Sequence, residues 1–272
     1  MICTTIDLWE GLNYSGEMDD GFRPKMTTYI RGGNKRRGIV TIFPGGGYGF
    51  TSPREAEPVA VAFNDAGYHA VYVDYSVAPR RHPAPLLDAA RALTIIKERA
   101  KEWHVDISRI FLCGFSAGGH LCASLSNLYT KKWVKEAHGI HLDELMIKGS
   151  ILAYPVLVYG KHMHQGSFAN LLGEDAKEEA CMSMSMDKCV HPSTPPTFLW
   201  HTVEDKAVPV ENSLIYATAL RQYDVPFEMH VYQKGSHGLS LSNTEVAENK
   251  DGVLPHVASW MRLCIEWMDE LT

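Results

Sequence analysis

One serine stands in the residue pattern that most clearly predicts chemistry. The motif is GFSAGG at 114–119, which gives Ser116 the spacing G-x-S-x-G. The apolar run RIFLC precedes it directly, and a stretch rich in small residues that predicts a helix follows it. A sharp turn from strand to helix exposes a serine hydroxyl and sets backbone N–H groups beside it. The pattern therefore predicts attack by Ser116 on a carbonyl carbon, with the N–H of Ala117 facing the oxyanion.

A serine nucleophile needs a base, and the base needs an orienting carboxylate, because the hydroxyl alone is weakly nucleophilic at neutral pH. Asp205 follows the apolar run TFLWHT, and His237 follows the run FEMHVY. Both residues lie just past a predicted strand, where open α/β sheets place their ligand sites. We therefore predict that Ser116, Asp205 and His237 act together as nucleophile, acid and base.

Other acids and bases compete for these roles. Glu204 adjoins Asp205, but Asp205 stands one place nearer to the turn that leads to Pro209 and is preferred. His120 is four residues past Ser116 on the same predicted helix, where no later carboxylate loop could orient it, so we interpret it as a packing or hydrogen-bonding residue. A lone histidine is more often structural than a ligand. Four histidines therefore have no assigned role: His162, His164, His201 and His230.

A glycine triplet predicts a second oxyanion donor. The segment PGGGYGF at 44–50 follows the apolar run IVTIF, and glycines at a strand end expose N–H groups without side chains in the way. We choose Gly46 and Gly47 as the donors. Alone, such a triplet also fits a phosphate nest or a plain loop. A dinucleotide site is excluded because no G-x-G-x-x-G opens a helix here.

Strand and helix patterns alternate around these motifs. Alternation of this kind predicts an α/β fold with a mostly parallel sheet and helices on both faces. The predicted strands are 39–43, 70–75, 109–114, 149–154, 197–202 and 227–232, and the predicted helices are 85–103, 116–129, 210–223 and 254–270.

Two segments interrupt this alternation within a single predicted domain of residues 1–272. Residues 155–196 form a long, polar and Met-rich connection between two strands, which predicts a small cap-like insertion with helices of its own. Residues 1–37 carry several turn-forming glycines and one strand pattern, MTTYI. We expect this segment to add an antiparallel edge to the parallel sheet.

Six segments, in this order, resemble the acetyl esterase/lipase branch of the α/β-hydrolases. That branch includes bacterial acetylxylan and feruloyl esterases and relatives of hormone-sensitive lipase. The resemblance covers about residues 38–270 and implies the same nucleophile, acid, base and oxyanion amides. In one departure, Pro44 stands where the branch often has histidine before the glycine triplet, so the loop is braced differently. The segments are PGGGYGF, VDYSVAP, HPAPLLDA, GFSAGGHL, PPTFLWHTVEDKAVPVENS and KGSHGLSL.

The resemblance implies a serine carboxylic-ester hydrolase that works through an acyl-enzyme and needs no metal or cofactor. Its small-acyl members favour removal of acetyl groups from sugar or xylo-oligosaccharide esters. A serine peptidase or arylformamidase is the alternative, since the same residues on this fold also attack amides. A non-catalytic ligand-binding protein is a further alternative, although such proteins commonly lose a member of the triad.

Composition narrows the partners and the compartment. Hydrophobic residues make up 45% and charged residues 21%, which is ordinary globular composition. The net charge of −6 leaves no basic excess to neutralise phosphates, so neither nucleic acid nor an anionic membrane is an expected partner. The six cysteines lack the dense spacing of a disulfide framework, and Cys181 and Cys189 match no zinc motif. The first 20 residues have neither the basic nor the apolar region of a signal peptide. We therefore expect a cytoplasmic protein with thiol cysteines, and the resemblance adds a homodimer as an expectation.

Overall fold

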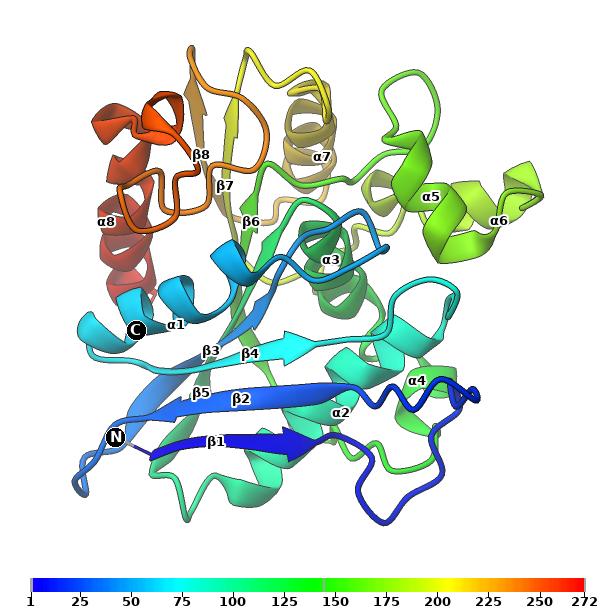
Figure 1. Cartoon of the computed structure of the whole chain (residues 1–272), viewed down its shortest axis with the longest axis vertical. Helices are drawn as coiled ribbons and strands as arrows, with labels where there is room; N and C mark the ends of the chain where they lie inside the picture. Colours follow the sequence, from blue (N-terminus) through cyan, green and yellow to red (C-terminus); the bar gives the residue numbers. More distant parts are fainter. Residues whose placement is uncertain (1, 144, 272) are drawn as a thin grey trace.

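Runs of β-branched and aromatic residues form one eight-stranded sheet in the computed structural model, which describes residues 2–143 and 145–271 (Figure 1). The strands run in the order β1-β2-β4-β3-β5-β6-β7-β8 across the sheet. Their bounds are β1 Ile2–Asp7, β2 Lys25–Ile30, β3 Arg37–Phe43, β4 His69–Asp74, β5 Val105–Phe115, β6 Ile147–Ala153, β7 Thr197–Thr202 and β8 Phe227–Tyr232.

The strands from β4 to β8 across the sheet are parallel, whereas β1 and β2 pair antiparallel at one edge. All six strands predicted for the parallel part are present. Because parallel strands bring their carboxyl ends to one edge, the loops after β3, β5, β7 and β8 meet there. The predicted α/β class and mostly parallel sheet are confirmed.

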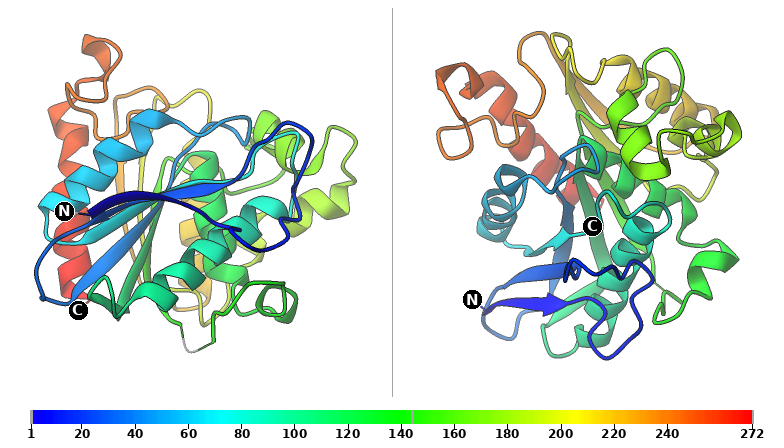
Figure 2. Two further views of the ribbon diagram at one scale, coloured as in Figure 1. Left: turned by 60° about the horizontal axis from the view of Figure 1, so that its bottom comes forward. Right: turned by 45° about the vertical axis from the view of Figure 1, so that its right-hand side comes forward.

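Helices cover both faces of this sheet (Figure 2). Helices α1 and α8 pack on one face, where Phe63 and Trp260 are buried, and α2, α3 and α7 pack on the other, where Leu93 and Leu220 are buried. Within the described residues, no helix has the length and hydropathy of a membrane span. The bounds are α1 Glu57–Asp65, α2 Ala84–Arg99, α3 Ala117–Leu128, α4 Lys132–Lys135, α5 Gln165–Leu172, α6 Glu178–Ser183, α7 Glu211–Gln222 and α8 Pro255–Glu270.

Strand β1 and helices α1 and α4 were not predicted from the sequence, and α4 is only four residues long. Strand β1 lies ahead of the turn-forming glycines, in a part of residues 1–37 for which no strand was predicted, and its residues are mostly exposed because it has a neighbour on one side only. Helix α1 is nine residues long and buries only a few side chains, among them Val59 and Phe63, so its apolar periodicity is short. The predicted helix 85–103 is also shorter in the structure, ending at Arg99 in α2.

The long connection between β6 and β7 contains α5, α6 and a short 3-10 helix, Met186–Lys188. These elements lie beside the sheet, on the side of α3 and α7 (Figure 1). Met186 is fully buried, and its N–H donates to the carbonyl of Leu157 at 2.7 Å. The connection is therefore packed onto the domain.

Candidate active site

The backbone at Ser116 makes the sharp turn that the sequence predicts. Ser116 follows β5 directly and has φ 53° and ψ −118°, a conformation that few non-glycine residues adopt. A Cβ at Gly114 would lie 2.2 Å from the Gly118 carbonyl oxygen, and one at Gly118 would lie 2.0 Å from the Phe43 carbonyl oxygen. Both glycines are therefore required for α3 to approach the sheet this closely.

Ser116 and Asp205 each lie within hydrogen-bonding distance of His237. Ser116 Oγ is 2.7 Å from His237 Nε2, and His237 Nδ1 is 2.6 Å from Asp205 Oδ2. An ionised carboxylate only accepts, so Nδ1 carries the ring proton and Nε2 is free to accept from the serine hydroxyl. The His237 ring also lies edge-on to Tyr154, with 5.1 Å between the ring centroids. The three predicted residues are thus brought together from the ends of β5, β7 and β8.

Asp205 is buried but favours its ionised form. Burial raises the pKa of Asp205, but hydrogen bonds from His201 and His237 outweigh this effect, and the pKa lies well below its usual value. Oδ1 also accepts the N–H groups of Ala207 and Val208 at 3.0 and 2.9 Å. The alternative acid, Glu204, instead accepts the N–H of Gly235 at 3.2 Å.

The glycine loop after β3 lies against the serine. Gly46 and Gly47 have φ values of 127° and 63°, and a Cβ on Gly46 would lie 2.0 Å from the Phe50 carbonyl oxygen. Gly45 packs on the serine itself, since a Cβ there would lie 2.9 Å from Ser116 Cβ. Gly46 and Gly47 line the same cavity as Ser116. The third predicted donor, Ala117, is the first residue of α3.

The cavity over the serine has a volume of about 610 Å³. It combines the glycine loop, the serine, the histidine and side chains from the connection between β6 and β7. The lining residues are Gly46, Gly47, Gly49, Phe50, Ser52, Arg54, Glu55, Ser116, His164, Gly166, Asn170, His237, Gly238 and Glu248.

A buried glutamate joins the loops around this cavity and was not singled out from the sequence. Glu55 is 3% exposed, and its carboxylate accepts the Gly45 N–H at 2.7 Å and the Tyr154 hydroxyl at 2.6 Å. The Tyr154 oxygen in turn accepts the N–H of Ser240, three residues after His237, at 2.9 Å. Burial raises the pKa of Glu55 above its usual range. The position of Glu55, shortly after the glycine triplet, was the signal that could have pointed to it.

Two histidines left unassigned from the sequence contact the site. His201 Nε2 lies 3.4 Å from Asp205 Oδ2, and the His201 side chain is fully buried. His164 lines the serine cavity, and burial together with the neighbouring His237 lowers its pKa. Its Nδ1 accepts the N–H of Ser167 at 3.2 Å, which places the ring proton on Nε2.

His120, His162 and His230 do not line the serine cavity. His120 is buried between the Tyr48 hydroxyl and the Met184 carbonyl, at 2.9 and 2.8 Å, and burial lowers its pKa to about 4. This agrees with the predicted packing and hydrogen-bonding role. His162 lies 3.9 Å from Glu211 and His230 lies 2.6 Å from Glu228, both away from the serine cavity.

The cysteines are thiols, and the described residues contain no group of three or more His, Cys, Asp or Glu side chains arranged to hold a metal ion. Cys113, Cys122, Cys181 and Cys264 are buried, and Cys3 is exposed.

Comparison with known proteins identifies the family of this chain. The BD-FAE family model matches residues 29–220. Endo-1,4-beta-xylanase B of Butyrivibrio fibrisolvens is 34% identical over 244 residues, covering 88% of this chain and 38% of that protein. Acetylxylan esterase of Xylanibacter ruminicola is 24% identical, covering 96% and 53%. The chain thus spans about half or less of the length of these curated relatives.

Solved structures match over nearly the whole chain. The acetyl ester-xyloside bifunctional hydrolase of Caldicellulosiruptor lactoaceticus is 37% identical with a TM-score of 0.88, covering 98% of this chain and 96% of that one. The carboxylesterase Cest-2923 of Lactobacillus plantarum is 27% identical with a TM-score of 0.80, covering 99% and 98%. The chain therefore belongs to the BD-FAE family, and it has the α/β-hydrolase fold.

Proposed function

We propose that the chain hydrolyses small acyl esters through a covalent acyl-enzyme on Ser116. The observation that carries this proposal is the position of His237, which lies 2.7 Å from the serine oxygen and 2.6 Å from the Asp205 carboxylate. A neutral imidazole held in this tautomer is oriented to take the serine proton. The turn at Ser116 and the adjacent glycine loop supply the remaining groups that acyl transfer needs.

The reaction then has two halves. His237 takes the hydroxyl proton as Ser116 Oγ attacks the acyl carbon, and the N–H groups of Gly46, Gly47 and Ala117 stabilise the oxyanion. The tetrahedral intermediate collapses, and His237 gives its proton to the departing alcohol. In the second half, His237 takes a proton from water, the resulting nucleophile attacks the acyl carbon, and Ser116 leaves with that proton restored. No step requires a metal or cofactor.

We propose acetylated sugars, and xylo-oligosaccharide esters in particular, as the substrates. Two similar proteins support this class: one is an acetylxylan esterase and the other an acetyl ester-xyloside hydrolase. The cavity over the serine is open and carries polar side chains from several loops, such as Asn170 and Glu248. Groups of this kind can bind the hydroxyls of a sugar.

We also propose the domain layout predicted above, a single domain in which residues 155–196 act as a cap and residues 1–37 add the edge. His164, Gly166 and Asn170 belong to this connection and line the serine cavity. Asn170 Nδ2 donates to the Gly47 carbonyl at 2.9 Å, which joins the cap to the glycine loop. The cap thus supports the loop that presents the oxyanion donors.

Hydrolysis of p-nitrophenyl esters from acetate to palmitate, beside acetylated xylobiose, tests the proposal. Wild type should prefer acetate and release acetate from the sugar, and Ser116→Ala should lose at least roughly a thousandfold of both activities. Ser108→Ala is the matched control, because Ser108 is an exposed serine at the other end of β5. Substantial turnover by Ser116→Ala would overturn the nucleophile assignment, and a long-chain preference without sugar release would overturn the substrate class.

A further inference from the structure

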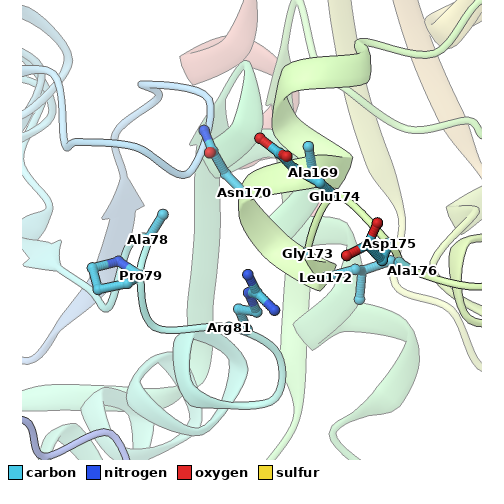
Figure 3. A pocket seen from close by; sticks show the side chains of 10 residues that line it. All are labelled: Ala78, Pro79, Arg81, Ala169, Asn170, Leu172, Gly173, Glu174, Asp175 and Ala176. Carbon is cyan, nitrogen blue, oxygen red and sulfur yellow. The ribbon is translucent and has the colours of Figure 1, made fainter.

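A second cavity adjoins the serine cavity and is shown in Figure 3. Its volume is about 640 Å³, and it lies between the connection from β4 to α2 and the carboxyl-terminal end of α5. Asn170 lines both cavities, so the two cavities are neighbours at this side chain. The lining residues are Ala78, Pro79, Arg81, Ala169, Asn170, Leu172, Gly173, Glu174, Asp175 and Ala176.

Hydrogen bonds fix the walls of this second cavity to each other and to the glycine loop. The N–H of His82 donates to the Leu171 carbonyl at 2.8 Å, which ties the β4–α2 connection to α5. The N–H of Ala78 donates to the Tyr48 carbonyl at 2.7 Å, in the loop that contains Gly46 and Gly47. The cavity therefore has a defined position relative to the reacting serine.

Arg81 is distinctive within this cavity. In the described part of the chain, it is the only arginine whose side chain makes no hydrogen bond or ion pair with another described residue; each of the others has a partner. Its guanidinium lies against Gly173, where a Cβ would come within 2.5 Å of Nη1. Figure 3 shows the side chain standing between Ala78 and Pro79 on one side and the end of α5 on the other. Its donors are thus available to a ligand.

Two carboxylates face the same cavity. Glu174 and Asp175 are exposed and make no side-chain hydrogen bond or ion pair with another described residue. Together with Arg81 they offer both donors and acceptors to a ligand. A strongly anionic ligand would meet both carboxylates, and a strongly cationic one would meet the guanidinium, so a neutral ligand rich in hydroxyl groups fits this set best.

We propose that this cavity binds the neutral oligosaccharide chain that extends from the acetylated sugar held at Ser116. The inference rests on the proposed function and adds a second binding region to it. Arg81 donates to sugar hydroxyl oxygens, and Glu174 and Asp175 accept from sugar hydroxyls. Acetylated substrates with a longer chain should therefore bind better than short ones, whereas an aryl acetate, which occupies only the serine cavity, should not use this region.

The test compares p-nitrophenyl acetate, acetylated xylobiose and acetylated xylotetraose in wild type, Arg81→Ala and Arg221→Ala. Arg221 is the matched control, since it is an exposed arginine on α7. We expect Arg81→Ala to raise KM for the tetraose about tenfold, the effect of losing one hydrogen bond to a charged group. Its turnover of p-nitrophenyl acetate should stay within about twofold of wild type, which also shows that the variant folds.

Binding measured without turnover completes the test. Calorimetry with unacetylated xylotetraose and Ser116→Ala should give a Kd that weakens about tenfold when Arg81→Ala is added. Equal losses on all substrates, or unchanged tetraose binding, would overturn the inference while leaving Ser116 as the nucleophile. Wild-type preference for an oligosaccharide bearing a uronic acid would overturn the neutral class. Failure of Ser116→Ala to lose aryl acetate hydrolysis would instead overturn the proposed function.

Discussion

Asp205 sets the tautomer of His237, because its ionised carboxylate accepts the proton on Nδ1. In Asp205→Asn, an amide NH₂ replaces one of the two carboxylate oxygens. When this NH₂ faces His237 Nδ1 it donates to that nitrogen, which favours the tautomer with the ring proton on Nε2. We expect kcat for p-nitrophenyl acetate to fall roughly 10³- to 10⁴-fold, because His237 could no longer accept the serine proton. Steady-state kinetics at neutral pH would measure this loss.

The adjacent carboxylate provides the control. Glu204→Gln changes a residue one position away whose carboxylate accepts the N–H of Gly235 rather than a histidine proton. It should retain kcat within a few-fold of wild type. If Glu204→Gln lost as much activity as Asp205→Asn, the assignment of the acid would be wrong.

Glu55 should affect turnover through the loops that it joins. Glu55→Gln keeps one acceptor oxygen but sets an amide NH₂ against either the Gly45 N–H or the Tyr154 hydroxyl. We expect kcat to fall about tenfold with KM little changed, because the glycine loop and the His237 loop would lose their shared anchor. Kinetics with p-nitrophenyl acetate would separate the two parameters.

Tyr154→Phe is a companion variant, since it removes the hydroxyl that links Glu55 to Ser240. Like Glu55→Gln it should lower kcat, but it does not bury an amide NH₂ against the Gly45 N–H or the Tyr154 hydroxyl. A lower melting temperature in both variants with kcat unchanged would show that Glu55 is only a structural anchor.

Single residues differ in how far the sequence reveals them. Ser116, Asp205 and His237 were predictable because each follows a recognisable strand, so that strand topology alone brings them to one edge of the sheet. Glu55 and His164 were not, because their importance depends on which loop packs on which. Those contacts join residues far apart in the chain, as the pair Glu55 and Tyr154 does.

At the scale of elements, α3 packs so closely on the sheet that there is no room for a side chain at Gly118. Gly118→Ala would place a methyl group 2.0 Å from the Phe43 carbonyl oxygen, which is backbone and cannot move freely. We expect the free energy of unfolding to fall by about 1–3 kcal/mol or more. Urea denaturation followed by circular dichroism would measure the change.

A second helical glycine serves for comparison. A Cβ at Gly166 in α5 would meet only His164 Cε1, at an ordinary 3.5 Å. Gly166→Ala should therefore leave stability equal or slightly higher, since alanine favours helix over glycine. Equal destabilisation by both variants would contradict the packing argument for α3.

The elements that were predicted correctly share a physical cause. Parallel strands such as β3 and β5 are buried on both faces and so appear as continuous apolar runs. β1 and α1 lack this signal: the first is an exposed edge strand, and the second is nine residues long. For both, the stabilising contacts come from tertiary pairing rather than from local pattern.

For the whole molecule, Asp88 connects the N-terminal segment to the α/β core. Its Oδ1 accepts the Trp9 indole N–H at 2.7 Å, and its Oδ2 accepts the Ser76 N–H at 2.8 Å. Burial raises the pKa of Asp88 to about 7, from 3.8. The folded state thus holds this proton more tightly than the unfolded chain does. The stabilisation that protonated Asp88 gives to the folded state is full below the pKa of Asp88 in the unfolded chain, and it is lost as the pH rises to about 7.

The expected consequence is a pH-dependent difference between wild type and Asp88→Asn. Between about pH 4 and pH 7 the Asp88 contribution to the free energy of unfolding should fall by up to about 1.4 kcal/mol per pH unit, and the variant should lack this contribution. Urea titrations at several pH values in this range would measure both curves. Parallel curves for the two proteins would show that Asp88 does not titrate differently on folding.

The order of strands in the sheet also has a consequence for the time at which the proposed active site is completed. Ser116 and the glycine loop lie in the first half of the chain. Asp205 and His237 follow β7 and β8, which are the last strands of the sheet to be synthesised and which form one edge of it. Ser116 and His237 are 121 positions apart. A growing chain therefore emerges from the ribosome with the proposed nucleophile but without the proposed base, and we expect no hydrolysis until β8 has docked.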